Sequence, residues 1–125
     1  MKIDIFGDSR YPVDRKYLRQ EVISLLKEFG FNEADQVFIE VTMMGNRKIK
    51  ELNRKFRQLD EKTDVLSFPL EDRNPGPDGL IRLGDIAVSF PEAMTMAIRT
   101  NRIVDKVIAE LVCHGIRHLM GEHHD

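Results

Sequence analysis

The sequence predicts a single α+β domain over residues 1–125, in which a mixed sheet of about four strands packs with about four helices. Three observations support this fold class. A chain of 125 residues with 42% hydrophobic and 32% charged residues has the size and composition of one globular domain. Strand-like alternation of apolar residues recurs between segments with helical periodicity. The resulting order, β-α-β-α-β-β-α-α, departs from the strict alternation of doubly wound and barrel folds.

The first predicted pair is a strand at 2–6, where polar and apolar residues alternate, and a helix from about Asp14 to Phe29. Asp14 is suited to cap this helix, and Gly30 stands where a helix often ends with a positive φ. The helix face that should point into the core carries Leu18, Val22, Leu25, Leu26 and Phe29.

The second predicted pair is a strand at 36–43 and a helix at about 46–57. The more apolar face of the strand carries Val37, Ile39 and Val41, and the inward face of the helix should carry Ile49, Leu52 and Phe56. The helix region is also locally basic, since seven cations lie within sixteen residues: Arg47, Lys48, Lys50, Arg54, Lys55, Arg57 and Lys62. Such an excess of positive charge is typical either of a solvated helix face or of a surface that contacts a phosphate backbone.

Two prolines help to place the remaining elements. Pro69 should end a strand, because proline has no N–H for a sheet ladder, and Pro91 favours the first turn of a helix. The last helix should bury a broad apolar face, and we interpret its Cys113 as a core residue. The predicted elements are strands at about 65–68 and 83–89, a turn-rich loop at 71–80, and helices from about 91 to 100 and from 101 or 102 to 120.

The last dozen residues contain all four histidines of the chain. His114 and His118 are four residues apart, which places both side chains on one face of a helix. Gly121 can end that helix with a positive φ, and the turn can then bring His124 back toward the pair. Three imidazoles can bind a transition metal and leave one coordination position open, which is the ligand count of a catalytic zinc site.

This spacing also occurs in the H-E-x-x-H-x-x-G-x-x-H motif of one class of zinc proteases. Those enzymes carry a glutamate directly after the first histidine as the general base, whereas this chain has Gly115. The metal-binding frame is therefore present without the base of a peptidase. The alternative interpretation is that surface histidines cluster at the tail without binding metal.

Four sequence blocks between residues 45 and 125 resemble one known family when they are taken together. The blocks are Leu52-Asn53-x-x-Phe56-Arg57, Thr63-Asp64-Val65-Leu66-Ser67-Phe68-Pro69, Leu83-Gly84-Asp85-Ile86 and His114-Gly115-x-x-His118-Leu119-x-Gly121-x-x-His124. In this combination the chain resembles the bacterial YbeY family, whose members are endoribonucleases that act in rRNA maturation and ribosome quality control.

The resemblance implies a zinc-dependent endoribonuclease that cuts single-stranded RNA, with the rRNA precursor and the small ribosomal subunit as partners. It implies one zinc ion (Zn2+) per chain, held by His114, His118 and His124 in an open groove. An essential arginine of the family falls on Arg57.

The chain departs from the family pattern in two places. Glu122-His123 replaces the usual Tyr-Asp, so that either His123 or His124 is the third ligand, and spacing favours His124. Family members also generally continue past Asp125, so that either the sequence is truncated or the third ligand lies on a free terminus.

The chemistry of these residues agrees with that implication. Zinc bound by three imidazoles lowers the pKa of a water ligand to about 7, and Arg57 can donate paired hydrogen bonds to a phosphate. The nucleophile is either hydroxide on the metal or the 2′-hydroxyl of the substrate, and the second would explain why no glutamate base is needed. Asp85 is a candidate to order a ligand imidazole, to cap a turn or to pair with an arginine.

Two other function classes remain alongside the endoribonuclease. One is a metallohydrolase of another substrate, although the missing glutamate argues against peptides. The other is a ribosome-associated RNA-binding module in which the metal is mainly structural. The net charge of −2 gives no global attraction to nucleic acid, so RNA binding would need a local patch, and no DNA or membrane partner is expected. A single cysteine, no secretory signal pattern and no long apolar run together predict a cytoplasmic protein.

Overall fold

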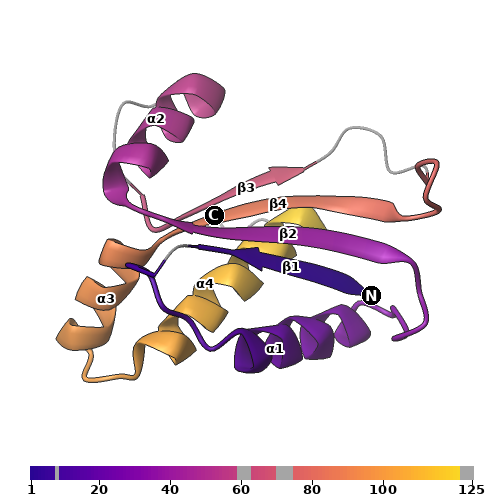
Figure 1. Ribbon diagram of the computed structural model, residues 1–125, viewed down its shortest axis with the longest axis horizontal. Coiled ribbons are helices and arrows are strands. Elements are labelled where there is room, and N and C mark those ends of the chain that lie inside the picture. Colours follow the sequence, from indigo (N-terminus) through magenta and orange to yellow (C-terminus); the bar gives the residue numbers. More distant parts are fainter. Residues whose placement is uncertain (8, 59–62, 70–74, 122–125) are drawn as a thin grey trace.

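The structure is a computed structural model that describes residues 1–7, 9–58, 63–69 and 75–121. The predicted order of elements is confirmed within these ranges (Figure 1). The strands are β1 (Lys2–Phe6), β2 (Val37–Met44), β3 (Val65–Pro69) and β4 (Ile81–Ser89), and the helices are α1 (Arg15–Glu28), α2 (Asn46–Arg57), α3 (Phe90–Arg99) and α4 (Val104–Leu119). None of the helices in the described part of the chain is both long enough and apolar enough to span a membrane.

The sheet is mixed, as predicted, with the strand order β1-β2-β4-β3. β2 pairs in parallel with both β1 and β4, and β3 pairs antiparallel with β4. β3 is therefore an edge strand of the sheet that the structure describes. The predicted α+β class holds because the antiparallel β3 and its neighbour β4 follow one another in the order of the described elements.

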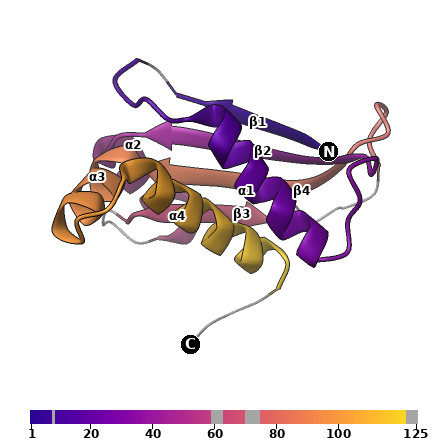
Figure 2. The same ribbon diagram turned by 90° about the horizontal axis from the view of Figure 1, so that it is seen from below.

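Three helices cover one face of the sheet, and the main core lies between them. α1, α3 and α4 all lie on this face (Figure 2), where Val37, Ile39 and Val41 of β2 are buried as predicted. The buried residues of α1 are Leu18, Val22, Leu25 and Leu26, and those of α4 include Val107, Ile108, Leu111, Val112, Ile116 and Leu119. Each fully buried aliphatic side chain contributes about 1.5–3 kcal/mol through removal from water.

α2 lies alone on the opposite face of the sheet, toward one end (Figure 1). Its first turn is fixed by side-chain hydrogen bonds: Ser89 Oγ donates to Asn46 Oδ1 (2.5 Å), and Asn46 Nδ2 donates to Glu92 Oε1 (3.1 Å). Ile49 is fully buried and forms a small second core with Leu66 and Ala87. The start of α2 is therefore anchored to β4 and α3.

Burial decreases along α2, which corrects one prediction. Ile49 is buried and Leu52 is half-buried, but Phe56 is 57% exposed although its helical position predicted an inward side chain. The helix is anchored at its N-terminal end, and no other segment in the described part of the chain covers its last turn. α2 then ends because Gln58 adopts a left-handed conformation (φ +59), with its N–H donating to Arg54 O at 3.1 Å.

The helix ends mostly follow the predicted capping signals. Asp14 accepts a hydrogen bond from the Tyr17 N–H (3.0 Å), and Gly30 has φ +96. The start of α4 differs from the prediction of 101 or 102 by two or three residues. Asn101 is left-handed (φ +53), and the Arg102 N–H turns back to Ala97 O (2.9 Å), so that helical geometry resumes only at Val104.

Candidate active site

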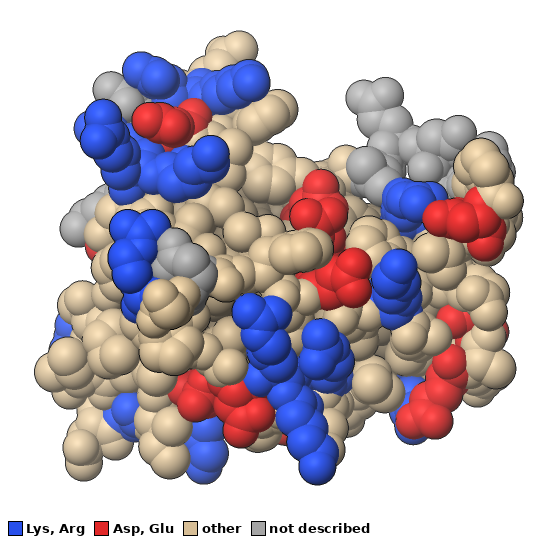
Figure 3. Space-filling view, in the orientation of Figure 1, with Lys and Arg blue, Asp and Glu red and all other residues tan. Residues whose placement is uncertain are grey.

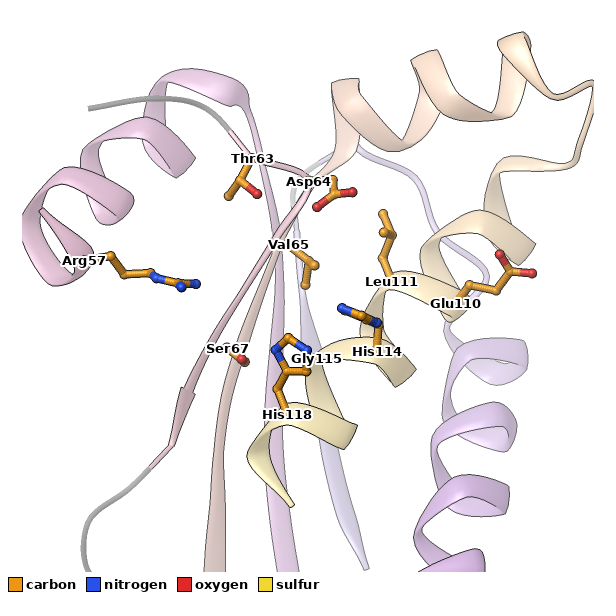
Figure 4. A pocket seen from close by; sticks show the side chains of 10 residues that line it. All are labelled: Arg57, Thr63, Asp64, Val65, Ser67, Glu110, Leu111, His114, Gly115 and His118. Atoms are coloured by element: carbon orange, nitrogen blue, oxygen red, sulfur yellow. The ribbon is translucent and has the colours of Figure 1, made fainter. Parts of the chain in front are cut away.

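His114 and His118 project from one face of α4, as their spacing predicted (Figure 4). Their ring centroids are 4.4 Å apart and the rings are tilted by 51°. His114 is exposed, whereas His118 is half-buried and its Nε2 atom is buried. Two imidazoles at this separation can contribute to the coordination of a single ion, since zinc lies about 2.0–2.1 Å from each ligand nitrogen.

Gly115 explains how α4 comes so close to the sheet. A Cβ atom at this position would lie 2.9 Å from Ile86 Cδ1 and 3.5 Å from Val65 Cγ2, and the residue is buried. In the sequence alone, Gly115 indicated only the absence of a protease base. The structure adds a packing requirement, because this position faces the sheet and has no room for a glutamate side chain.

Gly84 allows the C-terminal end of α4 to come equally close to the sheet. It has φ +145, and a Cβ atom there would lie 2.6 Å from Phe68 O and 2.8 Å from Leu119 Cδ2. Only glycine adopts such a conformation readily, and only glycine leaves room for the helix and β3. The sequence signal for this close contact, which was missed, is a glycine inside an otherwise apolar strand.

The two histidines open into a cavity of about 430 Å³ between α4, β3 and the end of α2. Val65 and Ser67 face it because alternate side chains of β3 point to the same side of the sheet. The described residues that line it are Arg57, Thr63, Asp64, Val65, Ser67, Glu110, Leu111, His114, Gly115 and His118 (Figure 4). The cavity thus combines two imidazoles, one guanidinium, two hydroxyls and two carboxylates.

Arg57 comes to this cavity from the opposite side of the molecule. It is the last residue of α2, and its side chain extends toward His118 (Figure 4). The side chain is exposed, so its planar group of donors is accessible to a ligand in the cavity. The structure therefore brings together Arg57, His114 and His118, which are the predicted site residues that it describes.

The predicted third ligand lies outside the described residues, as does its alternative: these are His124 and His123. Within the described ranges, no group of three or more His, Cys, Asp or Glu side chains is arranged to hold a metal ion. The helix end before them does match the prediction, because Gly121 has φ +90 and its N–H donates to His118 O (3.0 Å). The two described imidazoles fit part of a nitrogen donor set for zinc.

Asp85 does not lie beside the histidines, which corrects its suggested role of ordering an imidazole. It lies on the α2 side of the sheet, in register with Glu40 on the neighbouring strand, and lines a separate cavity. Burial raises the pKa of Asp85, and burial together with the charges of Asp85 and Asp4 raises the pKa of Glu40.

Cys113 packs against the main core, as predicted, although it is only partly buried. Burial, reinforced by the charge of Glu21, raises its pKa to about 11. The thiol is therefore protonated at neutral pH, unlike the thiolate that binds metals.

Comparison with known proteins identifies the family of this chain. The family described as endoribonuclease YbeY matches residues 6–125. The chain belongs to the YbeY family. The endoribonuclease YbeY of Dehalococcoides mccartyi is 35% identical over 125 residues, which cover 90% of this chain and 77% of the relative. That of Clostridioides difficile is 32% identical and covers 98% of this chain and 84% of the relative.

A solved structure extends the similarity to three dimensions. The solution structure of a protein from Thermotoga maritima has a TM-score of 0.62 and 31% identity, and the match covers 98% of this chain and 75% of that one. The described parts of the four blocks that resemble the YbeY family are adjacent in space here. The blocks on α2, β3 and α4 line the cavity, and the block on β4 supplies Gly84 and Ile86 beneath α4.

Proposed function

We propose that the chain is a zinc-dependent endoribonuclease that cleaves single-stranded RNA in rRNA maturation and ribosome quality control in the cytoplasm. The observation that carries the proposal is the convergence of His114, His118 and Arg57 on one cavity in a member of the YbeY family. The relatives named above are endoribonucleases by description, and their similarity covers most of the chain.

His114, His118 and His124 would hold the zinc ion, with His123 as the alternative third ligand. When bound, the ion supplies Lewis-acid chemistry at the phosphate and activates water near neutral pH. The carboxylates of Asp64, directly before β3, and of Glu110 on α4 line the same cavity, and they would repel an anionic substrate that entered beside them.

Arg57 would hold the scissile phosphate. Its guanidinium can donate two parallel hydrogen bonds to the non-bridging oxygens, where negative charge accumulates during cleavage. Thr63 and Ser67 line the same cavity, and their hydroxyls can donate further hydrogen bonds to the RNA. Val65 and Leu111 provide an apolar wall that limits access of bulk water.

The basic face of α2 would guide the RNA backbone to this cavity. It consists of six exposed cations that gather over α2 (Figure 3): Arg47, Lys48, Lys50, Arg54, Lys55 and Arg57. A local cluster is required because the whole chain carries a net charge of −2. Such a face binds phosphates without regard to sequence, so the proposed substrate, rRNA precursor in the small ribosomal subunit, rests on membership of the YbeY family.

The deciding experiment is cleavage of a single-stranded rRNA fragment by purified protein, with and without a chelator. We expect cleavage that a chelator abolishes, that zinc restores and that His114→Ala removes. Arg99→Ala, at an exposed position on α3, is the control for contaminating nucleases, which would persist in both variants. Cleavage that survives His114→Ala would refute the assignment. RNA binding without cleavage in the zinc-loaded protein would instead support an RNA-binding module.

The same assay separates the two candidate nucleophiles. A single 2′-deoxynucleotide on the 5′ side of the cut prevents cleavage if the 2′-hydroxyl of the substrate attacks. Cleavage continues at that position if water is the nucleophile.

A further inference from the structure

A second cavity lies on the other face of the sheet, beside the last turns of α2. Its volume is about 630 Å³. Apolar side chains of Met44, Leu52, Phe56 and Phe68 form walls of this cavity, and the carboxylates of Glu40 and Asp85 lie among the sheet residues that line it. Figure 3 shows a hollow on the α2 side of the molecule, with acidic side chains in it and the basic face of α2 next to it. The proposed chemistry of the histidine cavity does not use this site.

Two aromatic rings distinguish this cavity from an ordinary surface hollow. Phe56 and Phe68 meet edge to face, with centroids 5.4 Å apart and an interplanar angle of 66°. Phe56 remains 57% exposed, and Lys55 Nζ lies 5.3 Å from the centroid of its ring. Exposed aromatic rings interleaved with cations are the usual surface for single-stranded nucleic acid, because each base presents a face that can stack on a ring.

Residues that are neighbours in the sequence line the second cavity and the proposed active site. Phe56 directly precedes Arg57 on α2, and Ser67 directly precedes Phe68 on β3. Successive residues of a strand point to opposite faces, so Ser67 lines the histidine cavity and Phe68 lines the second one. The two cavities therefore flank β3, the edge strand of the described sheet.

The two carboxylates determine which part of the RNA the cavity can accept. Glu40 and Asp85 are paired in register on neighbouring strands, so their charges lie close together. They repel a phosphate but can accept hydrogen bonds from the amino group of a base.

We propose that the second cavity binds one unpaired nucleobase of the RNA strand whose phosphate Arg57 holds. The base stacks on Phe56, and its exocyclic amino group donates to Glu40 or Asp85. Cytosine, adenine and guanine carry such an amino group, whereas uracil offers only its ring N3–H, so we expect the three amino-bearing bases to be favoured at this position. The inference rests on the proposed endoribonuclease function, and it adds a reason for the enzyme to require unpaired RNA.

The test measures binding of short 2′-O-methyl RNA oligonucleotides to the zinc-loaded protein, with one abasic position moved stepwise along the strand. We expect one position at which loss of the base weakens binding about 5- to 150-fold, the range for a single stacking contact. Phe56→Ala should weaken binding of the intact oligonucleotide to a similar extent and leave binding of that abasic oligonucleotide unchanged. Phe56→Trp should retain the preference for an intact base, and Phe56→Leu should lose it.

The matched control is Phe6→Ala, because Phe6 is also exposed (48%) but does not line the cavity. Cytosine should bind better than uracil at the sensitive position, and Glu40→Ala combined with Asp85→Ala should remove the difference. Equal binding of intact and abasic oligonucleotides at all positions would overturn the proposal and leave the cavity to a protein partner. Because the readout is binding, loss of the nuclease assignment alone would leave this result unaffected.

Discussion

Gly115 sets the distance between α4 and the sheet, and thereby the position of the two histidines. A glutamate at this position, as in the zinc proteases with a similar histidine spacing, would direct a charge toward the buried side chain of Ile86 and the partly buried side chain of Val65. We expect Gly115→Glu to lower the free energy of unfolding by at least about 3 kcal/mol, since an unpaired buried charge is rarely tolerated. Urea denaturation followed by circular dichroism measures this change. A stable variant would show that α4 can move away from β4.

Gly115→Ala with Ile86→Val gives a finer test of the same contact. The single alanine substitution gains about 1 kcal/mol of helix propensity, but its methyl group lies 2.9 Å from Ile86 Cδ1, so this end of the Ile86 side chain must move and part of the gain is lost. Ile86→Val removes that atom, so the double variant should be more stable than the sum of the two single changes predicts. Additive changes would contradict the close contact.

Glu40 gives a prediction about pH. Burial, Asp85 and Asp4 raise its pKa in the folded protein. The unfolded chain therefore releases this proton at lower pH than the folded one, so the contribution of Glu40 to stability is present below its unfolded pKa and is lost as pH rises through the folded pKa. Glu40→Gln should raise the melting temperature at pH 7 and change it little near pH 4. Glu33→Gln is the control, because Lys27 lowers the pKa of Glu33 and the effect at pH 7 should be reversed.

At the scale of elements, the two ends of α2 have different roles: the first turn anchors the helix, and the last turn carries residues that line the two cavities. Its first turn is fixed to Ser89 and Glu92, whereas its last turn carries Phe56 and Arg57 beyond the small core. The periodicity of the sequence predicted the helix and its bounds, because periodicity reports which residues share a face. It could not predict that Phe56 would be exposed, because that depends on how far the sheet extends beneath the helix.

Arg57 and Arg54 should therefore respond differently to substitution, although both are exposed on the last turns of α2. Arg57→Ala should lower kcat/KM for RNA cleavage by about 100- to 1,000-fold, the usual effect of removing a hydrogen-bond donor to the charge that develops in the transition state. Arg57→Lys should restore only part of the lost kcat/KM. Arg54→Ala should leave kcat unchanged and weaken RNA binding. For a single strand, the slope of log affinity against log salt should become less steep by about 0.7. Equal effects of the two alanine variants on kcat would contradict the specific role of Arg57.

At the scale of the whole molecule, the histidines of α4 lie on one side of the sheet and the aromatic cavity lies on the other. Local patterns predicted the eight elements, the burial of β2 and α4, and the shared face of His114 and His118. They did not predict the strand order or the side on which α2 lies, because these depend on contacts between distant segments. Asp85 was misplaced for this reason: its strand was predicted correctly, but not the face to which it points.

The identity of the third ligand also depends on contacts between distant segments, because the residues after Gly121 must return to the histidine pair. The helix end at Gly121 was predicted from one glycine and is confirmed by φ +90. Residues 122–125, which follow it, lie outside the described structure. Spacing favours His124 over His123, and this remains a prediction.

The central claim is tested most directly by the zinc content of the purified protein and of its single histidine variants. We predict close to one zinc ion per chain in the unmodified protein and a large loss in His114→Ala, His118→Ala and His124→Ala. His123→Ala, next to the predicted ligand, should keep its zinc. A zinc content near zero in the unmodified protein, or one that none of these substitutions changes, would contradict the claim that these histidines hold a metal ion at the cavity.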